Sequence, residues 1–192
     1  MPSKTLNPLT VQLVKYHTSL PFEDVISRLE KETDKAGNTC IVQHIKRTKD
    51  QSELEALIHK NVGETGFLCV GLLTFILRDH SSAWFRSYFS ETFYHQLVEK
   101  AEATTQPKLA IYVIGNPLIA QSILQNNRFA ALNIPLRLLV AENLEGNGTT
   151  VAYHLPSTVM TRPDGENTLA FERQITLLND KLEKLVFRIT AD

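Results

Sequence analysis

The sequence predicts an α+β fold, in which helices cover a mixed, largely antiparallel sheet of about six strands and the last element is a long helix. Short apolar or alternating runs recur between segments of helical periodicity. Residues 145–148 have the glycine-rich composition of a hairpin turn. The final segment, residues 166–190, repeats apolar side chains on one helix face. Strands joined partly by hairpins and partly by helices favour this fold class.

Length and composition predict a single domain. The chain has 192 residues, of which 43% are hydrophobic, so it can bury a sizeable core. No internal repeat or low-complexity region divides it. We interpret residues 78–107 as an aromatic-rich insertion within one α+β domain spanning 1–192.

The N-terminal half begins with a predicted strand, residues 10–18, whose side chains alternate in character. A helix follows from Pro21, with an apolar stripe, and is expected to end at residues 37–38, because Gly and Asn tolerate a left-handed cap. Residues 39–47 (TCIVQHIKR) predict a second strand. The stripe residues are Phe22, Val25, Ile26 and Leu29.

Asp50 and Glu53 form a capping-box pattern, which predicts a second helix that ends at Gly63. Residues 66–77 predict a third strand. Because this run is apolar on both faces, we expect it to be central in the sheet.

The C-terminal half has clearer signals for where its strands and helices begin and end. Residues 109–114 predict a strand, and Asn116 followed by Pro117 predicts a helix start, since Asn caps well and Pro suits the first helical position. Strands are expected at residues 136–141 and 149–155, on either side of the hairpin turn.

The last predicted helix carries apolar residues at alternating spacings of four and three, which is an a/d seam. Either the seam packs on the protein's own sheet, or it forms a dimer contact. Leu169, Leu177 and Val186 widen the apolar face and favour packing on the domain itself. The seam residues are Phe171, Ile175, Leu178, Leu182, Leu185 and Ile189.

Charge and hydropathy exclude several classes of partner. Net charge is −1 with acids and bases interspersed, so no nucleic acid partner is expected. The longest apolar run, residues 67–77, is too short to span a bilayer, and the N-terminus lacks the apolar core of a signal peptide. We therefore expect a cytoplasmic protein with no membrane partner. Cys40 and Cys69 are interpreted as buried thiols or, alternatively, as a lone disulfide.

Three runs carry a family resemblance: IYVIGNPLIAQSIL, AALNIPLRLLVAE and TTVAYHLPS. In this order they resemble the domain of unknown function 302 family over residues 109–157. The resemblance implies an α+β fold and a homodimer, and it assigns no catalytic roles. Residues 67–108 look like an elaboration seen in longer, fungal-type members. The matching positions are Gly115, Asn116, Pro117, Pro135, Arg137 and Tyr153.

Two histidines are candidate acid/base groups, because imidazole exchanges protons near neutral pH. His80 stands where the aromatic insertion begins, and His44 interrupts an apolar row, although it could equally be a satisfied core histidine. The aromatic segment is either a secondary core or a wall over a pocket. The candidate ligand-binding residues are Trp84, Phe85, Tyr88, Asn116, Arg137 and Tyr153.

Two of these candidates have structural alternatives. Asn116 could be only a helix cap, or its helix start could hold an anion. Arg137 could pair with a neighbouring acid instead of a ligand. No metal-ligand spacing, nucleophile elbow or phosphate-binding glycine motif occurs, so we expect no metal and no cofactor.

These observations favour a dimeric protein that binds a small organic ligand between the sheet and the aromatic insertion. The alternative is a cofactor-independent enzyme, such as an isomerase, cyclase or lyase, with histidine as general acid/base. A third hypothesis is a structural dimer without a ligand.

Overall fold

The computed structural model describes residues 2–33, 41–45, 47–78, 82–88, 107–162 and 167–192, with the backbone alone at residues 42, 43, 73–78 and 82–88. Six strands form one sheet in the order β1-β6-β5-β4-β2-β3, and every neighbouring pair is antiparallel. The α+β prediction is confirmed. The strands are β1 Leu13–Thr18, β2 Leu68–Arg78, β3 Ser82–Tyr88, β4 Lys108–Gly115, β5 Leu136–Glu142 and β6 Thr149–His154.

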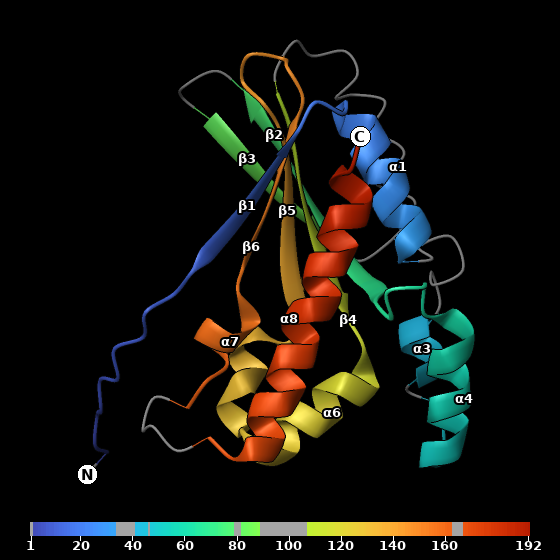
Figure 1. Cartoon of the computed structure of the whole chain (residues 1–192), viewed down its shortest axis with the longest axis vertical. Coiled ribbons are helices and arrows are strands. Elements are labelled where there is room, and N and C mark those ends of the chain that lie inside the picture. The colour runs from blue at the N-terminus through green and yellow to red at the C-terminus, as the bar shows by residue number, and fades with distance from the viewer. Residues whose placement is uncertain (1, 34–40, 46, 79–81, 89–106, 163–166) are drawn as a thin grey trace.

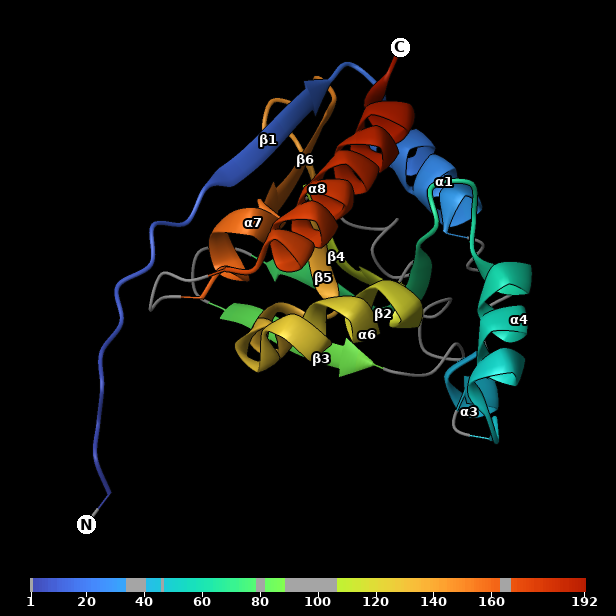
Figure 2. The same cartoon turned by 60° about the horizontal axis from the view of Figure 1, so that its bottom comes forward.

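Helices α1 and α8 pack on one face of this sheet, as Figures 1 and 2 show, with α6 and α7 near one end and α3 and α4 at the side. Within the described ranges, no helix is long and apolar enough to cross a bilayer. The helices are α1 Phe22–Glu32, α3 Ile41–Ile45, α4 Gln51–Asn61, α6 Pro117–Asn126, α7 Pro156–Val159 and α8 Leu169–Thr190, with a 3-10 helix η1 at Arg128–Asn133.

The apolar seam of α8 is used by the protein's own core. All six seam side chains are at most 5% exposed within the single chain. Leu169 and Leu177, which widen the predicted face, are 74% and 53% exposed instead. Of the two uses predicted for the seam, packing on the protein's own sheet is therefore the one observed.

Alternate residues of the central strands face these helices. Tyr112 on β4, Leu138 and Val140 on β5, and Val151 on β6 are fully buried in the main core. Because side chains alternate along a strand, the residues between them face the other side of the sheet. That second face is the setting of the candidate site.

The prediction of a strand at residues 39–47 is wrong, because the described part of this segment is the helix α3. Ile41 and Ile45 are four residues apart and lie on one face of a helix, where they pack in a small cluster with Ile58 of α4 and Leu68 of β2. A short β-branched run fits strand and helix equally well in sequence, and this tertiary contact decides between them. Cys40 lies outside the described residues.

The position of the third predicted strand and the structure of the aromatic insertion differ from what the sequence suggested. The strand predicted at residues 66–77 is β2, which is second from one edge and not central. The edge strand beside it is β3, which comes from the predicted aromatic insertion and pairs with β2 as an antiparallel hairpin. Helix α1 ends at Glu32, and the predicted stop at residues 37–38 lies outside the described residues.

Candidate functional site

A recess of about 680 Å³ opens on the second face of the sheet. Ile111 and Val113 of β4, Leu139 of β5 and Ala152 of β6 contribute to its lining. These positions alternate with the buried core positions, so they belong to the face turned away from α1 and α8. The size falls within the roughly 300–1,000 Å³ that is usual for ligand pockets.

One row of residues crosses the sheet at the recess. Leu13 on β1 pairs with His154 on β6, Arg137 on β5 pairs with Val113 on β4, and Val113 pairs with Gly71 on β2. Extending the β5–β6 register by two residues beyond the Leu139–Ala152 pair places Arg137 opposite His154. The two polar side chains are thus flanked on both sides by apolar residues or glycine.

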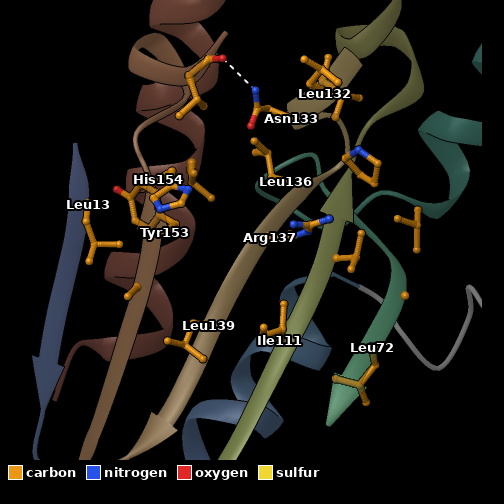
Figure 3. A pocket seen from close by; sticks show the side chains of 18 residues that line it. Leu13, Leu72, Ile111, Leu132, Asn133, Leu136, Arg137, Leu139, Tyr153 and His154 are labelled. Atoms are coloured by element: carbon orange, nitrogen blue, oxygen red, sulfur yellow. Dashed lines mark hydrogen bonds between the residues drawn. The ribbon is translucent and has the colours of Figure 1, made fainter. Parts of the chain in front are cut away.

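Strands β5 and β6 part at this row. Their paired region ends at Leu139 and Ala152, although both strands continue past it. The recess reaches between them to Leu136 and to Leu182 of α8, which are only 8% and 1% exposed. Figure 3 shows Leu136, Arg137 and His154 around this opening between β5 and β6.

The rim of the recess is built by the segment that leads into β5. Leu132 is 84% exposed, and the side-chain amide of Asn133 donates to the carbonyl of Val159 at 2.8 Å, which ties η1 to α7 (Figure 3). Pro135 also lines the rim, and a Cβ on Gly115 would come within 3.3 Å of the Pro135 Cβ. Glycine at position 115 therefore allows the end of β4 to approach the rim closely.

Arg137 is the strongest polar feature of the recess. Its side chain is exposed, and within the described part of the chain no carboxylate lies at ion-pair distance from it. The alternative of an ion pair with a neighbouring acid is therefore not observed among these residues. An unpaired guanidinium next to apolar surface is suited to bind a carboxylate through two parallel hydrogen bonds.

Tyr153 lines the recess, but its hydroxyl lies on the core side of β6. The residue is 4% exposed, and it lies near Tyr16, whose hydroxyl donates a hydrogen bond to Oε1 of Glu183 at 3.2 Å. Burial, the neighbouring Tyr16 and the Glu183 carboxylate raise the pKa of Tyr153 well above its usual value. The tyrosine therefore stays neutral, and the Tyr16–Glu183 hydrogen bond joins β1 to α8 beside it.

Asn116 caps α6, as predicted. Its Oδ1 accepts a hydrogen bond from the backbone N–H of Leu118 at 2.9 Å, and its Nδ2 donates to the carbonyl of Gly66 at 2.9 Å. Both ends of the amide are thus bonded to the protein itself. Asn116 is not among the residues that line the recess.

The structure does not place the remaining candidates at the recess, and of Trp84, Phe85 and Tyr88 it describes only the backbone, so their ligand-binding role stays a prediction. His44 has an exposed side chain and lies on α3, the helix observed where a strand was predicted at residues 39–47. Trp84, Phe85 and Tyr88 lie on β3, where the backbone pairs them with Ile76, Phe75 and Leu72. His80 lies outside the described residues, so its role stays a prediction.

Sequence reasoning did not select His154, Ile111, Val113 or Leu139 as site residues. The signal was present, because the strands at 109–114 and 136–141 are apolar on both faces, although α1 and α8 cover only one. A second apolar face needs a ligand, a partner or another layer. No group of three or more potential metal ligands occurs among the described residues.

Comparisons with known proteins agree with this fold. A family model described as "Domain of unknown function DUF302" matches residues 89–186, slightly more than half of the chain. The chain is similar to a crystal structure of an uncharacterized conserved protein DUF302 from Bacillus stearothermophilus, with a TM-score of 0.50 and 15% sequence identity. The match covers 92% of this chain and 97% of that one, and at this identity it supports the fold alone. No curated protein matches the chain.

Proposed function

The chain belongs to the DUF302 family, and we propose that it binds a small organic anion, with a carboxylate and an apolar body, in the recess between β5 and β6. The observation that carries this proposal is the position of Arg137. A cationic side chain, with no ion-pair partner among the described residues, lies in a lining that is mostly apolar. Ligand sites commonly combine mostly apolar walls with a few polar groups that fix orientation.

The carboxylate would lie between Arg137 and His154. The extended register places these residues on opposite sides of the opening. The guanidinium supplies a fixed pair of donors, and an imidazole N–H supplies a third. Hydrogen bonds to a charged group contribute about 1.5–3 kcal/mol each in protein interiors, so the two residues together could anchor a small acid.

The apolar body has two surfaces to occupy. Ile111 and Leu139 form a partly exposed apolar surface beside Arg137, and the opening leads inward to Leu136 and Leu182. Removing this surface from water is favourable by about 25 cal/mol for each Å² buried. A flexible aliphatic chain or a flat ring of modest size would fit a recess of about 680 Å³.

Calorimetric titration with a matched series tests this proposal. Decanoate and decanol have the same chain and differ in charge, and hexanoate shortens the apolar body. We expect decanoate to bind more tightly than both other probes. In Arg137→Gln, decanoate should bind about 10- to 100-fold more weakly, which corresponds to losing a charge-assisted contact.

Arg173→Gln is the matched control, because Arg173 is an exposed arginine on α8 and does not line the recess. This variant should bind decanoate as the wild type does. Equal binding of decanoate and decanol, together with unchanged binding by Arg137→Gln, would contradict the proposed anion site.

A second candidate function rests on His154. An imidazole across the opening from a guanidinium offers an acid/base group and a cation that can stabilise an enolate, which are the groups that a cofactor-independent isomerase needs. Proton NMR of phenylpyruvate in D₂O tests this. Catalysed deuterium incorporation at the carbon next to the carbonyl, lost in His154→Gln, would support the enzyme. Exchange at the rate of buffer alone would leave binding as the function.

A further inference from the structure

The N-terminal segment, residues 2–12, forms an extended arm that runs away from the body of the protein (Figures 1 and 2). Three apolar side chains on it meet solvent, since Leu6, Leu9 and Val11 are 80%, 49% and 46% exposed. Among the hydrogen bonds of the described residues, none involves residues 2–11. Because these apolar side chains are largely exposed where the arm lies, burying them against another surface would be favourable.

The arm joins the body at the edge of the recess. The N–H of Gln12 donates to Oγ1 of Thr158 at 3.2 Å, and its carbonyl accepts from the N–H of Leu155 at 2.9 Å. The next residue, Leu13, lines the recess and is 53% exposed. The arm therefore has a fixed attachment point beside the proposed ligand site, and everything before that point is free of the body.

The arm is long enough to cross the recess. Paired strands lie about 4.8 Å apart, so β6 is about 5 Å from β1, and β5 and β4 lie at least about 10 Å and 14 Å from it, because β5 and β6 part at this row. An extended chain covers about 3.3 Å per residue. Leu9, three residues before Gln12, can thus reach the opening between β6 and β5, and Leu6, six residues before it, can reach β4.

We propose that this arm is a strap that folds across the recess when a ligand fills it, so that Leu9 covers the opening between β5 and β6 and Leu6 covers Ile111 on β4. This inference rests on the proposed ligand site. A bend just ahead of Gln12 is all that the movement requires, and the rest of the arm can stay extended. Attachment at the rim gives the arm a high effective concentration at its own recess, which favours its own chain over a second copy.

The strap is tested with decanoate on the full-length protein. In the double variant Leu6→Ser, Leu9→Ser, we expect decanoate to bind at least about tenfold more weakly and to dissociate faster, because two apolar side chains no longer cover it. Both positions are exposed, so the variant should fold normally. Leu144→Ser is the control, since Leu144 is 85% exposed in the β5–β6 turn, outside the recess lining, and this variant should bind as the wild type does.

Hydrogen–deuterium exchange supplies the second measurement. Adding decanoate should slow exchange of the amides of residues 3–11 in the wild type, at protein concentrations where light scattering reports no change in mass. Wild-type affinity in the double variant, with no added protection of the arm, would overturn the strap and leave the ligand site intact. Failure of the wild type to bind decanoate would overturn both. Protection that appears only together with a doubled mass would assign the arm to a second copy and overturn closure within one chain.

Discussion

Asn116 holds together two segments that are fifty residues apart. Its amide nitrogen donates to the carbonyl of Gly66, just before β2, and its amide oxygen caps α6 at Leu118, both at 2.9 Å. A single side chain thereby fixes the start of β2 relative to the start of α6. The residue that marks the helix start in the sequence is therefore also a tertiary connection.

Replacing Asn116 should cost more than an ordinary helix cap. Asn116→Ala removes the cap, worth about 1 kcal/mol, and also the bond to Gly66, worth about another 1 kcal/mol. We expect the free energy of unfolding in urea to fall by about 2 kcal/mol. Asp50→Ala, which removes the local cap of α4 to Glu53, should cost about half as much. Equal losses in the two variants would contradict the tertiary role of Asn116.

Two glycines of the β5–β6 turn should respond very differently to alanine. Both have positive φ, 67° at Gly146 and 115° at Gly148, but a Cβ at position 148 would lie 2.1 Å from the Thr18 carbonyl oxygen. A Cβ at position 146 meets nothing within 4 Å. Thermal unfolding should show a loss of about 1 kcal/mol for Gly146→Ala and on the order of 3 kcal/mol or more for Gly148→Ala. Similar losses of stability in the two variants would contradict the close contact between Gly148 and the Thr18 carbonyl.

Adjacent leucines on α8 test how the predicted seam is used. Leu178 is 4% exposed in the single chain, whereas Leu177 is 53% exposed. Leu178→Ala should lower the free energy of unfolding by about 2–5 kcal/mol, and Leu177→Ala by less than about 0.5 kcal/mol. Denaturation at several protein concentrations should give the same midpoint for Leu178→Ala. A midpoint that depends on concentration would instead indicate a contact between subunits through the seam.

The stability of the protein should decrease at alkaline pH because of Tyr153. Its pKa is raised in the folded protein by burial, Tyr16 and Glu183, so the folded state keeps a proton that the unfolded chain releases near pH 10. The stabilisation is complete below pH 10 and is lost as pH rises toward the raised pKa, by up to about 1.4 kcal/mol per pH unit. Urea titrations between pH 9 and 11.5 should show a shallower decline for Tyr153→Phe. Identical slopes would show that Tyr153 ionises as freely in the folded protein as in the unfolded chain.

Helix starts, turns and the last helix were predictable from the sequence because the residues that specify them are close together in the chain. The caps at Asp50 and Asn116, the turn glycines and the periodicity of the last helix each depend on neighbouring residues, and each is confirmed. Residues 39–47 carry no such signal. The helical conformation of residues 41–45 depends on the packing of Ile41 and Ile45 against Ile58, which lies in another element.

The sequence by itself determined the fold class, the elements β4, α6, β5, β6 and α8 and the family resemblance, because these follow from backbone propensities and from the spacing of apolar residues. Only the tertiary structure decided that the α8 seam is buried in its own core and that β5 and β6 part beside Arg137. Such features depend on the register between strands and on which helix covers which face. Residues from five strands meet at the recess, and no local pattern records which of them become neighbours.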